Sequence, residues 1–181
     1  MVWYSLFSHT GSETARVAEL IKQQPELALT TNINYDGPLK CLKFTSGTLV
    51  NDWLMRPDKI KPNSIITLNG YMRILPKTVL EYLDFINCKV FNIHPAPISV
   101  YPNLRGKDPQ ERLYDGIQTG EYNLMGVVIH KVDAGVDTGR IVLEKAVAAD
   151  PSMTKAGLYN YLHDMGTELW VEFFREELFN G

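Results

Sequence analysis

The residues best suited to chemistry lie together in residues 91–95, where Asn92 and His94 flank one apolar residue. Residues 89–93 have the composition of a β-strand, and side chains two positions apart in an extended segment share a face. Pro95 biases His94 toward an extended conformation and ends the strand there. A carboxamide donates hydrogen bonds, and an imidazole can also exchange a proton near neutral pH. A structural asparagine beside a histidine that is satisfied in a polar pocket is the alternative interpretation.

A third candidate lies in residues 133–139, where Asp133 and Asp137 stand between two strand-like segments. Asp and Gly are typical of ordinary turns, which is the structural interpretation of this loop. The loop is nevertheless longer than a turn requires. A carboxylate from it that faced His94 would fix the tautomer of the imidazole.

The elements that position these residues alternate between strand-like runs and amphipathic helices. This order predicts an α/β fold: a single Rossmann-like domain with a mostly parallel central sheet flanked by helices. In such sheets ligands bind at the carboxyl ends of the strands, where Asn92 and His94 lie. Strands are predicted at residues 2–7, 27–33, 39–44, 64–68, 89–93, 124–132 and 140–147, and helices at 47–55 and 78–83, after Thr10, from Asp108 and from Asp150.

Helix signals accompany several of these boundaries. Thr10 and Glu13 form a capping-box pattern, in which the hydroxyl caps the helix and the carboxylate reaches back. Pro76 is expected at a first helical position, and Asp108 with Pro109 is typical of an N-cap followed by a first turn.

Length and composition limit the class of protein. A chain of 181 residues fits one domain, residues 1–181. The net charge of -3 argues against a nucleic-acid partner. Only Cys41 and Cys88 are present, which favours a reducing, cytoplasmic location. No apolar run is long enough to cross a bilayer, and the first residues lack the features of a secretory signal. The four histidines lie far apart in the sequence, so no metal site is expected.

Taken in order, several motifs resemble the catalytic domain of the folate-dependent formyltransferases. They are Ser8-His9-Thr10-Gly11-Ser12, Leu68-Asn69-Gly70-Tyr71-Met72-Arg73-Ile74-Leu75, Asn92-Ile93-His94-Pro95 and Asp133-Ala134-Gly135-Val136-Asp137-Thr138-Gly139. The chain is identified as a member of this family. By its size it is most similar to the glycinamide ribonucleotide formyltransferases, which are single small domains.

The resemblance implies transfer of a formyl group from 10-formyltetrahydrofolate, a co-substrate, to the primary amine of glycinamide ribonucleotide in purine biosynthesis. Formylation of an amino-sugar nucleotide or another amine by the same folate-dependent mechanism is the alternative, because residues 105–109 are similar to the Arg-Gly-x-x-Pro segment of the tRNA and sugar enzymes. A degenerate folate-binding module is the non-enzymatic alternative. The expected partners are a small-molecule amine and folate, without nucleic acid or membrane, and the expected state is a monomer or homodimer.

The resemblance also implies roles for individual residues. Asn92 would donate to the developing oxyanion, His94 would donate to it or carry protons, and Asp137 would orient His94. Folate binding is implied for Met72, Arg73, Ile74, Leu75, Val132, Asp133, Ala134 and Gly135, and acceptor binding for Thr10, Gly11, Ser12, Glu13 and Pro95.

Two of these segments have competing interpretations. Asn69 and Gly70 could form a hairpin turn, and the apolar residues of 72–75 could be plain core. Arg73 is the better indication of a site, because a charged residue in an apolar segment usually needs a partner. Glu13 replaces the family's asparagine and adds negative charge beside the proposed phosphate, where the backbone amides of Gly11 and Ser12 would bind.

Overall fold

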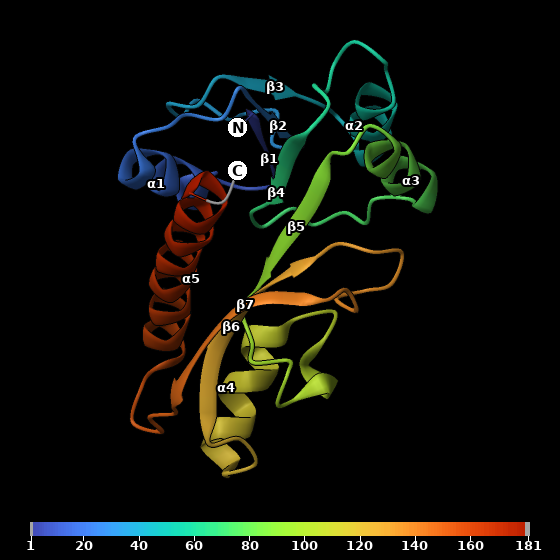
Figure 1. Cartoon of the computed structure of the whole chain (residues 1–181). Coiled ribbons are helices and arrows are strands. Elements are labelled where there is room, and N and C mark those ends of the chain that lie inside the picture. Colours follow the sequence, from blue (N-terminus) through green and yellow to red (C-terminus); the bar gives the residue numbers. More distant parts are fainter. Residues whose placement is uncertain (1, 180–181) are drawn as a thin grey trace.

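The computed structural model describes residues 2–179 and is built on a seven-stranded sheet in the order β3-β2-β1-β4-β5-β6-β7 (Figure 1). The first five strands in this order run parallel, whereas β6 pairs antiparallel with β5 and with β7. The predicted α/β fold with a mostly parallel sheet is confirmed. The strands are β1 Val2–Phe7, β2 Leu27–Thr30, β3 Cys41–Lys43, β4 Ser64–Leu68, β5 Lys89–His94, β6 Leu124–Lys131 and β7 Ile141–Ala148.

Helices cover both faces of this sheet. They are α1 Ser12–Ile21, α2 Gly47–Leu54, α3 Lys77–Phe85, the short 3₁₀ helix η1 Pro102–Leu104, α4 Pro109–Thr119 and α5 Lys155–Phe179. Figure 1 shows α5 beside α1, on the opposite side of the sheet from α2 and α3. No helix within residues 2–179 has the length and apolar character needed to cross a membrane.

The two faces of the sheet carry separate hydrophobic clusters, and in the strands β1, β4 and β5 neighbouring residues belong to different clusters. In β1, Trp3 packs with residues of α1, α4 and α5, whereas Tyr4 packs with residues of α2 and α3. In β5, Phe91 belongs to the first cluster and Val90 to the second. By the same alternation Asn92 and His94 lie on the face of α2 and α3, and Ile93 lies on the face of α5.

The strands predicted at residues 27–33 and 39–44 and the last predicted helix are longer than the observed elements. The strand predicted at residues 27–33 ends at Thr30 because Thr30 Oγ1 accepts the N–H of Asn32 at 3.0 Å, and the side chain of Asn32 folds the next turn in the same way. The last helix begins at Lys155 rather than Asp150. Asp150 instead accepts the N–H of Ser152 at 2.9 Å in a local turn, and Thr154 caps the helix.

The predicted N-terminal signals are only partly correct. The capping box at Thr10 and Glu13 is wrong, because Gly11 occupies the N-cap position of α1 with φ 63°, and Thr10 Oγ1 accepts the N–H of Ser12 rather than that of Glu13. Asp108 does precede α4, but its φ is 51° and its carboxylate makes no capping bond. Pro76 occupies the N-cap position of α3 and not the first helical position.

Candidate active site

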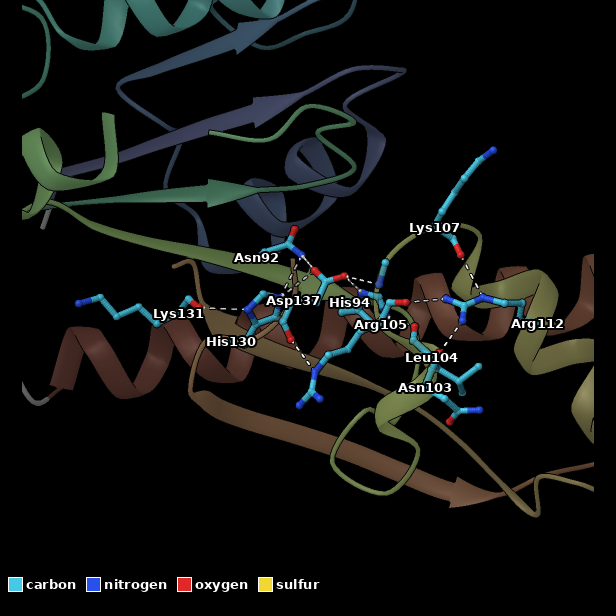
Figure 2. Close-up of polar contacts among 11 residues, drawn as sticks. Asn92, His94, Asn103, Leu104, Arg105, Lys107, Arg112, His130, Lys131 and Asp137 are labelled. Atoms are coloured by element: carbon cyan, nitrogen blue, oxygen red, sulfur yellow. Dashed lines mark hydrogen bonds and ion pairs between the residues drawn. The ribbon is translucent and has the colours of Figure 1, made fainter. Parts of the chain in front are cut away.

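Strand pairing places the chemistry-bearing residues on one face at the carboxyl end of β5. The register pairs Asn92 with His130 of β6, and directly paired residues of an antiparallel ladder project to the same face. The loop from β6 to β7 then returns Asp137 to this face, where Figure 2 shows it between Asn92, His94 and His130. The structure therefore brings together the three residues proposed from the sequence and adds a second histidine.

The carboxylate of Asp137 is the centre of this cluster. Its Oδ2 lies 3.2 Å from His94 Nδ1 and accepts the backbone N–H of Gly106 at 2.9 Å. Its Oδ1 lies 3.4 Å from His130 Nε2 and 3.4 Å from Asn92 Nδ2. The side chains of both histidines are almost fully buried, and that of Asp137 is 14% exposed. A small part of the Asp137 side chain thus remains exposed.

The hydrogen-bond donors around Asp137 keep its carboxyl group ionised. Burial alone raises the pKa of this carboxyl, because it penalises the ionised form. Hydrogen bonds from His130 and His94, with the charge of His94 and the N–H of Gly106, outweigh burial and hold the pKa of Asp137 well below its usual range. Asp137 is therefore an anion that accepts hydrogen bonds rather than a strong base.

Both ring nitrogens of His94 face acceptors. Nδ1 faces the Asp137 carboxylate, and Nε2 lies 2.9 Å from the carbonyl oxygen of Leu104. A carbonyl oxygen and an ionised carboxylate can only accept hydrogen bonds, so in each of these contacts the ring nitrogen is the donor when it carries a proton. The ring of His94 is thus held on one side by Leu104 O and on the other by Asp137.

The carboxamide of Asn92 turns its nitrogen inward. Nδ2 lies 3.4 Å from Asp137 Oδ1 and 3.2 Å from His130 Nε2. In Figure 2 the amide oxygen of Asn92 points away from Asp137. The group that could donate to a substrate oxygen is therefore engaged within the protein, and the carbonyl oxygen is presented in its place.

Residues 103–107 support Asp137 from the other side. Gly106, at φ 82°, gives its N–H to the carboxylate, and Arg105 Nε donates to the main-chain oxygen of Asp137 at 2.8 Å. Arg112 of α4 in turn donates to the carbonyl oxygens of Asn103, Arg105 and Lys107 (Figure 2). One guanidinium thus holds the segment that holds Asp137.

Sequence reasoning did not identify His130 or Arg112 as parts of this cluster. His130 lies on a predicted strand, but only the pairing register places it opposite Asn92. Arg112 acts through carbonyl groups of a segment whose path no periodicity reveals. The resemblance of residues 105–109 to an Arg-Gly-x-x-Pro segment marked the region without assigning its contacts.

The residues proposed for folate binding form two parts. Met72 and Ile74 are 66% and 69% exposed, and Leu75 is buried. Arg73 is exposed and makes no ion pair within residues 2–179, but its alkyl stem packs near Gly47. The interpretation of Met72 and Ile74 as core is therefore wrong.

The second part of the proposed folate region lies after β6. The N–H of Val132 donates to Val90 O at 2.8 Å, and its side chain packs on the cluster that contains Leu75. Asp133 Oδ1 accepts the N–H of Gly135 and the hydroxyl of Thr138, which fold the exposed loop around it. No hydrogen bond or ion pair joins Asp133, Ala134 or Gly135 to residues 72–75 in the described part of the chain.

The residues proposed for the acceptor surround the first turn, and this turn joins the segment after β4. Ser8 Oγ accepts the N–H of Met72 at 2.9 Å, and Ser8 N donates to Gly70 O. Thr10 Oγ1 accepts the N–H of Ser12 at 3.3 Å, and both side chains are exposed. Pro95 follows His94 and is partly buried.

Glu13 does not point toward the turn. A Cβ built on Gly166 of α5 would lie 3.0 Å from Glu13 Oε1 and 3.0 Å from Ile93 Cδ1, so the carboxyl group packs between α1 and α5. Burial raises the pKa of Glu13 to about 7. The negative charge expected beside a bound phosphate is accordingly directed into the protein and is partly neutralised near pH 7.

No group of His, Cys, Asp and Glu side chains among residues 2–179 could hold a metal ion. The polar centre of the cluster is instead satisfied by hydrogen bonds among its own members.

Comparisons with solved structures agree with this fold. A phosphoribosylglycinamide formyltransferase from Campylobacter jejuni superposes with a TM-score of 0.78 at 19% identity, covering 98% of this chain and 97% of that one. The enzyme from Coxiella burnetii, solved with CHES, gives 0.77 at 20% identity, covering 96% and 84%. At these identities the likeness establishes a shared fold.

The relatives found by sequence comparison include two kinds of formyltransferase, which are named for different acceptors. A methionyl-tRNA formyltransferase from Syntrophomonas wolfei is 32% identical over 164 residues, 90% of this chain and 43% of that protein. A phosphoribosylglycinamide formyltransferase from Dictyostelium discoideum is 32% identical over 112 residues, 60% of this chain and 52% of that protein. The chain spans about half the length of these relatives.

A family model described as formyl transferase matches residues 11–174, which is most of the sequence and includes every member of the Asp137 cluster. The resemblance drawn from the motifs is confirmed: the chain belongs to the formyl transferase family.

Proposed function

We propose that this chain transfers a formyl group from 10-formyltetrahydrofolate to the primary amine of glycinamide ribonucleotide, a step of purine biosynthesis. The observation that carries the proposal is the Asp137 carboxylate, held by two histidines beside Asn92 at the carboxyl end of β5. This is the position at which α/β sheets bind their ligands.

The reaction makes three demands on the chain. The amine attacks as a neutral nitrogen, the formyl oxygen gains negative charge, and the folate nitrogen takes a proton as its bond to the formyl carbon breaks. One proton leaves the amine for each proton that the folate nitrogen gains. The site must therefore attract a partial positive charge on the amine and stabilise the developing oxyanion.

Asp137 meets the first demand. Its lowered pKa keeps it ionised, and because its side chain is partly exposed it can accept an N–H of the attacking amine. His94 balances the charge of Asp137 and fixes its orientation through the bond at 3.2 Å. The Nε2–H of His94 reaches a substrate oxygen only when Leu104 O gives up its hydrogen bond.

Asn92 meets the second demand when one of its N–H groups turns to the formyl oxygen. A donor of this kind typically contributes about 3 kcal/mol to a transition state. The rest of the acceleration comes from holding the amine and the formyl carbon in attack geometry.

The segment at residues 72–75 supports the folate assignment. The exposed side chains of Met72 and Ile74 offer apolar surface beside a buried cluster, which a flat pterin ring can cover. Exposed large apolar side chains grouped in this way commonly mark a binding surface.

The first turn supports a phosphate-bearing acceptor. The N-terminal end of α1 presents backbone N–H groups beyond Gly11, and Glu13 is directed toward α5. Thr10 and Ser12 add exposed hydroxyl groups. A phosphate at this turn would meet N–H dipoles and hydroxyl donors.

Two other acceptors have specific support. Residues 105–109 are similar to a segment of the sugar-nucleotide enzymes, which favours an amino-sugar nucleotide. A relative named methionyl-tRNA formyltransferase is 32% identical, which favours methionyl-tRNA. The net charge of -3 argues against the tRNA acceptor, because phosphate backbones are bound by a basic excess.

An acceptor screen tests the proposal. The chain is mixed with 10-formyltetrahydrofolate and, in separate reactions, glycinamide ribonucleotide, an amino-sugar nucleotide or methionyl-tRNA, and the absorbance of the released tetrahydrofolate is followed. Turnover only with the ribonucleotide is expected. Turnover with another acceptor alone overturns the acceptor assignment, and release with none of them overturns the transferase assignment.

A further inference from the structure

His130 is a buried histidine whose two ring nitrogens have different surroundings. The residue is 2% exposed, and its Nδ1 lies 3.1 Å from the carbonyl oxygen of Lys131. Because a carbonyl oxygen can only accept, Nδ1 carries a proton. In the neutral ring Nε2 therefore has no proton, and only the ring protonated on both nitrogens can donate from Nε2 to Asp137, the hydrogen bond that lowers the pKa of that carboxyl.

That Nε2 has two polar neighbours. Asn92 Nδ2 lies 3.2 Å away, and Asp137 Oδ1 lies 3.4 Å away. In the neutral ring, Nε2 can only accept, so it takes an N–H from Asn92. In the protonated ring, Nε2 donates to Asp137 and repels the amide nitrogen of Asn92.

We infer that His130 is a positioning residue that sets the orientation of the Asn92 carboxamide and holds Asp137 from the side opposite His94. The inference deepens the proposed function and rests on it. With both N–H groups given to His130 and Asp137, Asn92 shows its carbonyl oxygen to a substrate. When His130 donates to Asp137, one N–H of Asn92 becomes free for the formyl oxygen.

The charged groups around His130 are few. Asp137 faces it from the loop between β6 and β7, and His94 faces the same carboxylate from β5. Arg105 reaches only the main-chain oxygen of Asp137, and the ammonium group of Lys131 turns to Asp84 at 3.4 Å. Asp137 is therefore the carboxylate that accepts a hydrogen bond from Nε2 when Nε2 carries a proton.

The competing explanation is that His130 only fills space and satisfies Lys131 O. Two substitutions separate the explanations, because an amide can replace either nitrogen. His130→Asn places a donor near the Nδ1 position and nothing at Nε2. His130→Gln places a polar group near the Nε2 position and nothing at Nδ1.

The first measurement is steady-state formyl transfer to glycinamide ribonucleotide by the full chain. We expect His130→Asn to lower kcat about tenfold or more with KM nearly unchanged, and His130→Gln to stay within about threefold of the parent. Equal losses in the two variants, or a larger loss in His130→Gln, would overturn the inference. His163→Asn, an exposed histidine of α5, is the matched control.

The second measurement does not depend on turnover. Long-range proton–nitrogen NMR of the unliganded parent should show His130 with Nδ1 protonated, and a ring protonated only at Nε2 would overturn the inference. The side-chain amide signal that Asn92→Ser removes should shift in His130→Asn, and an unshifted signal would also count against it. If the parent protein turns over no acceptor, the proposed function fails while these spectra still test the geometry.

Discussion

Two carboxyl groups withdrawn from solvent, Glu13 and Asp137, have opposite electrostatic surroundings. Asp137 receives hydrogen bonds from Gly106 and from side chains on two strands, and its pKa is held well below the usual range. Glu13 packs against Gly166 and Ile93, receives no hydrogen bond from a described residue, and its pKa is raised to about 7. Burial acts on both groups in the same direction, so the donors make the difference.

The two regions that hold these carboxyl groups differ in how many polar groups act on each carboxyl. At the end of β5, strands, a loop and the guanidinium of Arg112 all act on one carboxylate, directly or through residues 103–107. At the first turn, Gly11 offers no side chain to cap α1, and Glu13 receives no hydrogen bond from residues 2–179. The hydrogen bonds to Asp137 keep its negative charge in a fixed place. The inward orientation of Glu13 keeps its carboxyl group away from the first turn, where we propose that the phosphate of the acceptor binds.

The largest expected effect follows from removing the charge of Asp137. Asp137→Asn leaves His94 without its carboxylate partner, and we expect kcat for formyl transfer to fall about 10²- to 10⁴-fold. Circular dichroism should show a folded protein. The matched control is Asp84→Asn, an exposed partner of Lys131, which should retain full activity. Near-normal turnover by Asp137→Asn would contradict its role.

The same variant tests the electrostatics through stability. A lowered pKa means that the native state binds this proton less readily than the unfolded chain, so the stabilisation from Asp137 is present above the ordinary carboxyl pKa of 3.8 and is lost as the pH falls below it. Denaturant titrations of the parent should show this loss, and those of Asp137→Asn should lack it.

The next effect concerns Glu13 and has the opposite sign. Its pKa rises from 4.5 to about 7, so stability is present below pH 4.5 and is lost as the pH rises through 7. Glu13→Gln should therefore increase the free energy of unfolding at pH 8 by about 1–3 kcal/mol, less than the full shift because part of the side chain reaches solvent. At pH 4 the two proteins should be nearly equal.

Glu19→Gln is the matched control for this prediction, since Glu19 lies exposed on the same helix and pairs with Arg16. Its stability should change little between the two pH values. A Glu13→Gln protein no more stable than its parent at pH 8 would show that Glu13 has donors in solution.

The sequence predicted the surroundings of Asp137 better than those of Glu13. Period-two alternation placed Asn92 and His94 on one face, and the strand at residues 64–68 has the predicted bounds because it is one continuous buried run. The motif order connected Asp137 with His94. These signals are local or come from the resemblance.

The contacts that sequence reasoning missed depend on tertiary placement. His130 faces Asn92 only through the register of an antiparallel pair, and Arg112 acts through the path of residues 103–107. The capping box failed at Glu13 because Gly166 of α5 leaves room for the carboxyl group to turn inward. The position of Glu13 thus depends on α5, a helix distant in the sequence, and not on the local pattern around the first turn.

The smallest expected effect comes from weakening the support of residues 103–107, the segment whose Gly106 donates a hydrogen bond to Asp137. Arg112→Lys replaces a planar group that spans the carbonyls of Asn103, Arg105 and Lys107 with a single ammonium. We expect kcat to fall about threefold to tenfold and the free energy of unfolding to fall by about 1–2 kcal/mol, because Gly106 then holds the carboxylate less firmly. Arg56→Lys, at an exposed position, is the control and should change neither. If Arg112→Lys lowered stability while kcat stayed at the parent value, the segment would support the fold alone, and Asp137 would owe its orientation to the histidines.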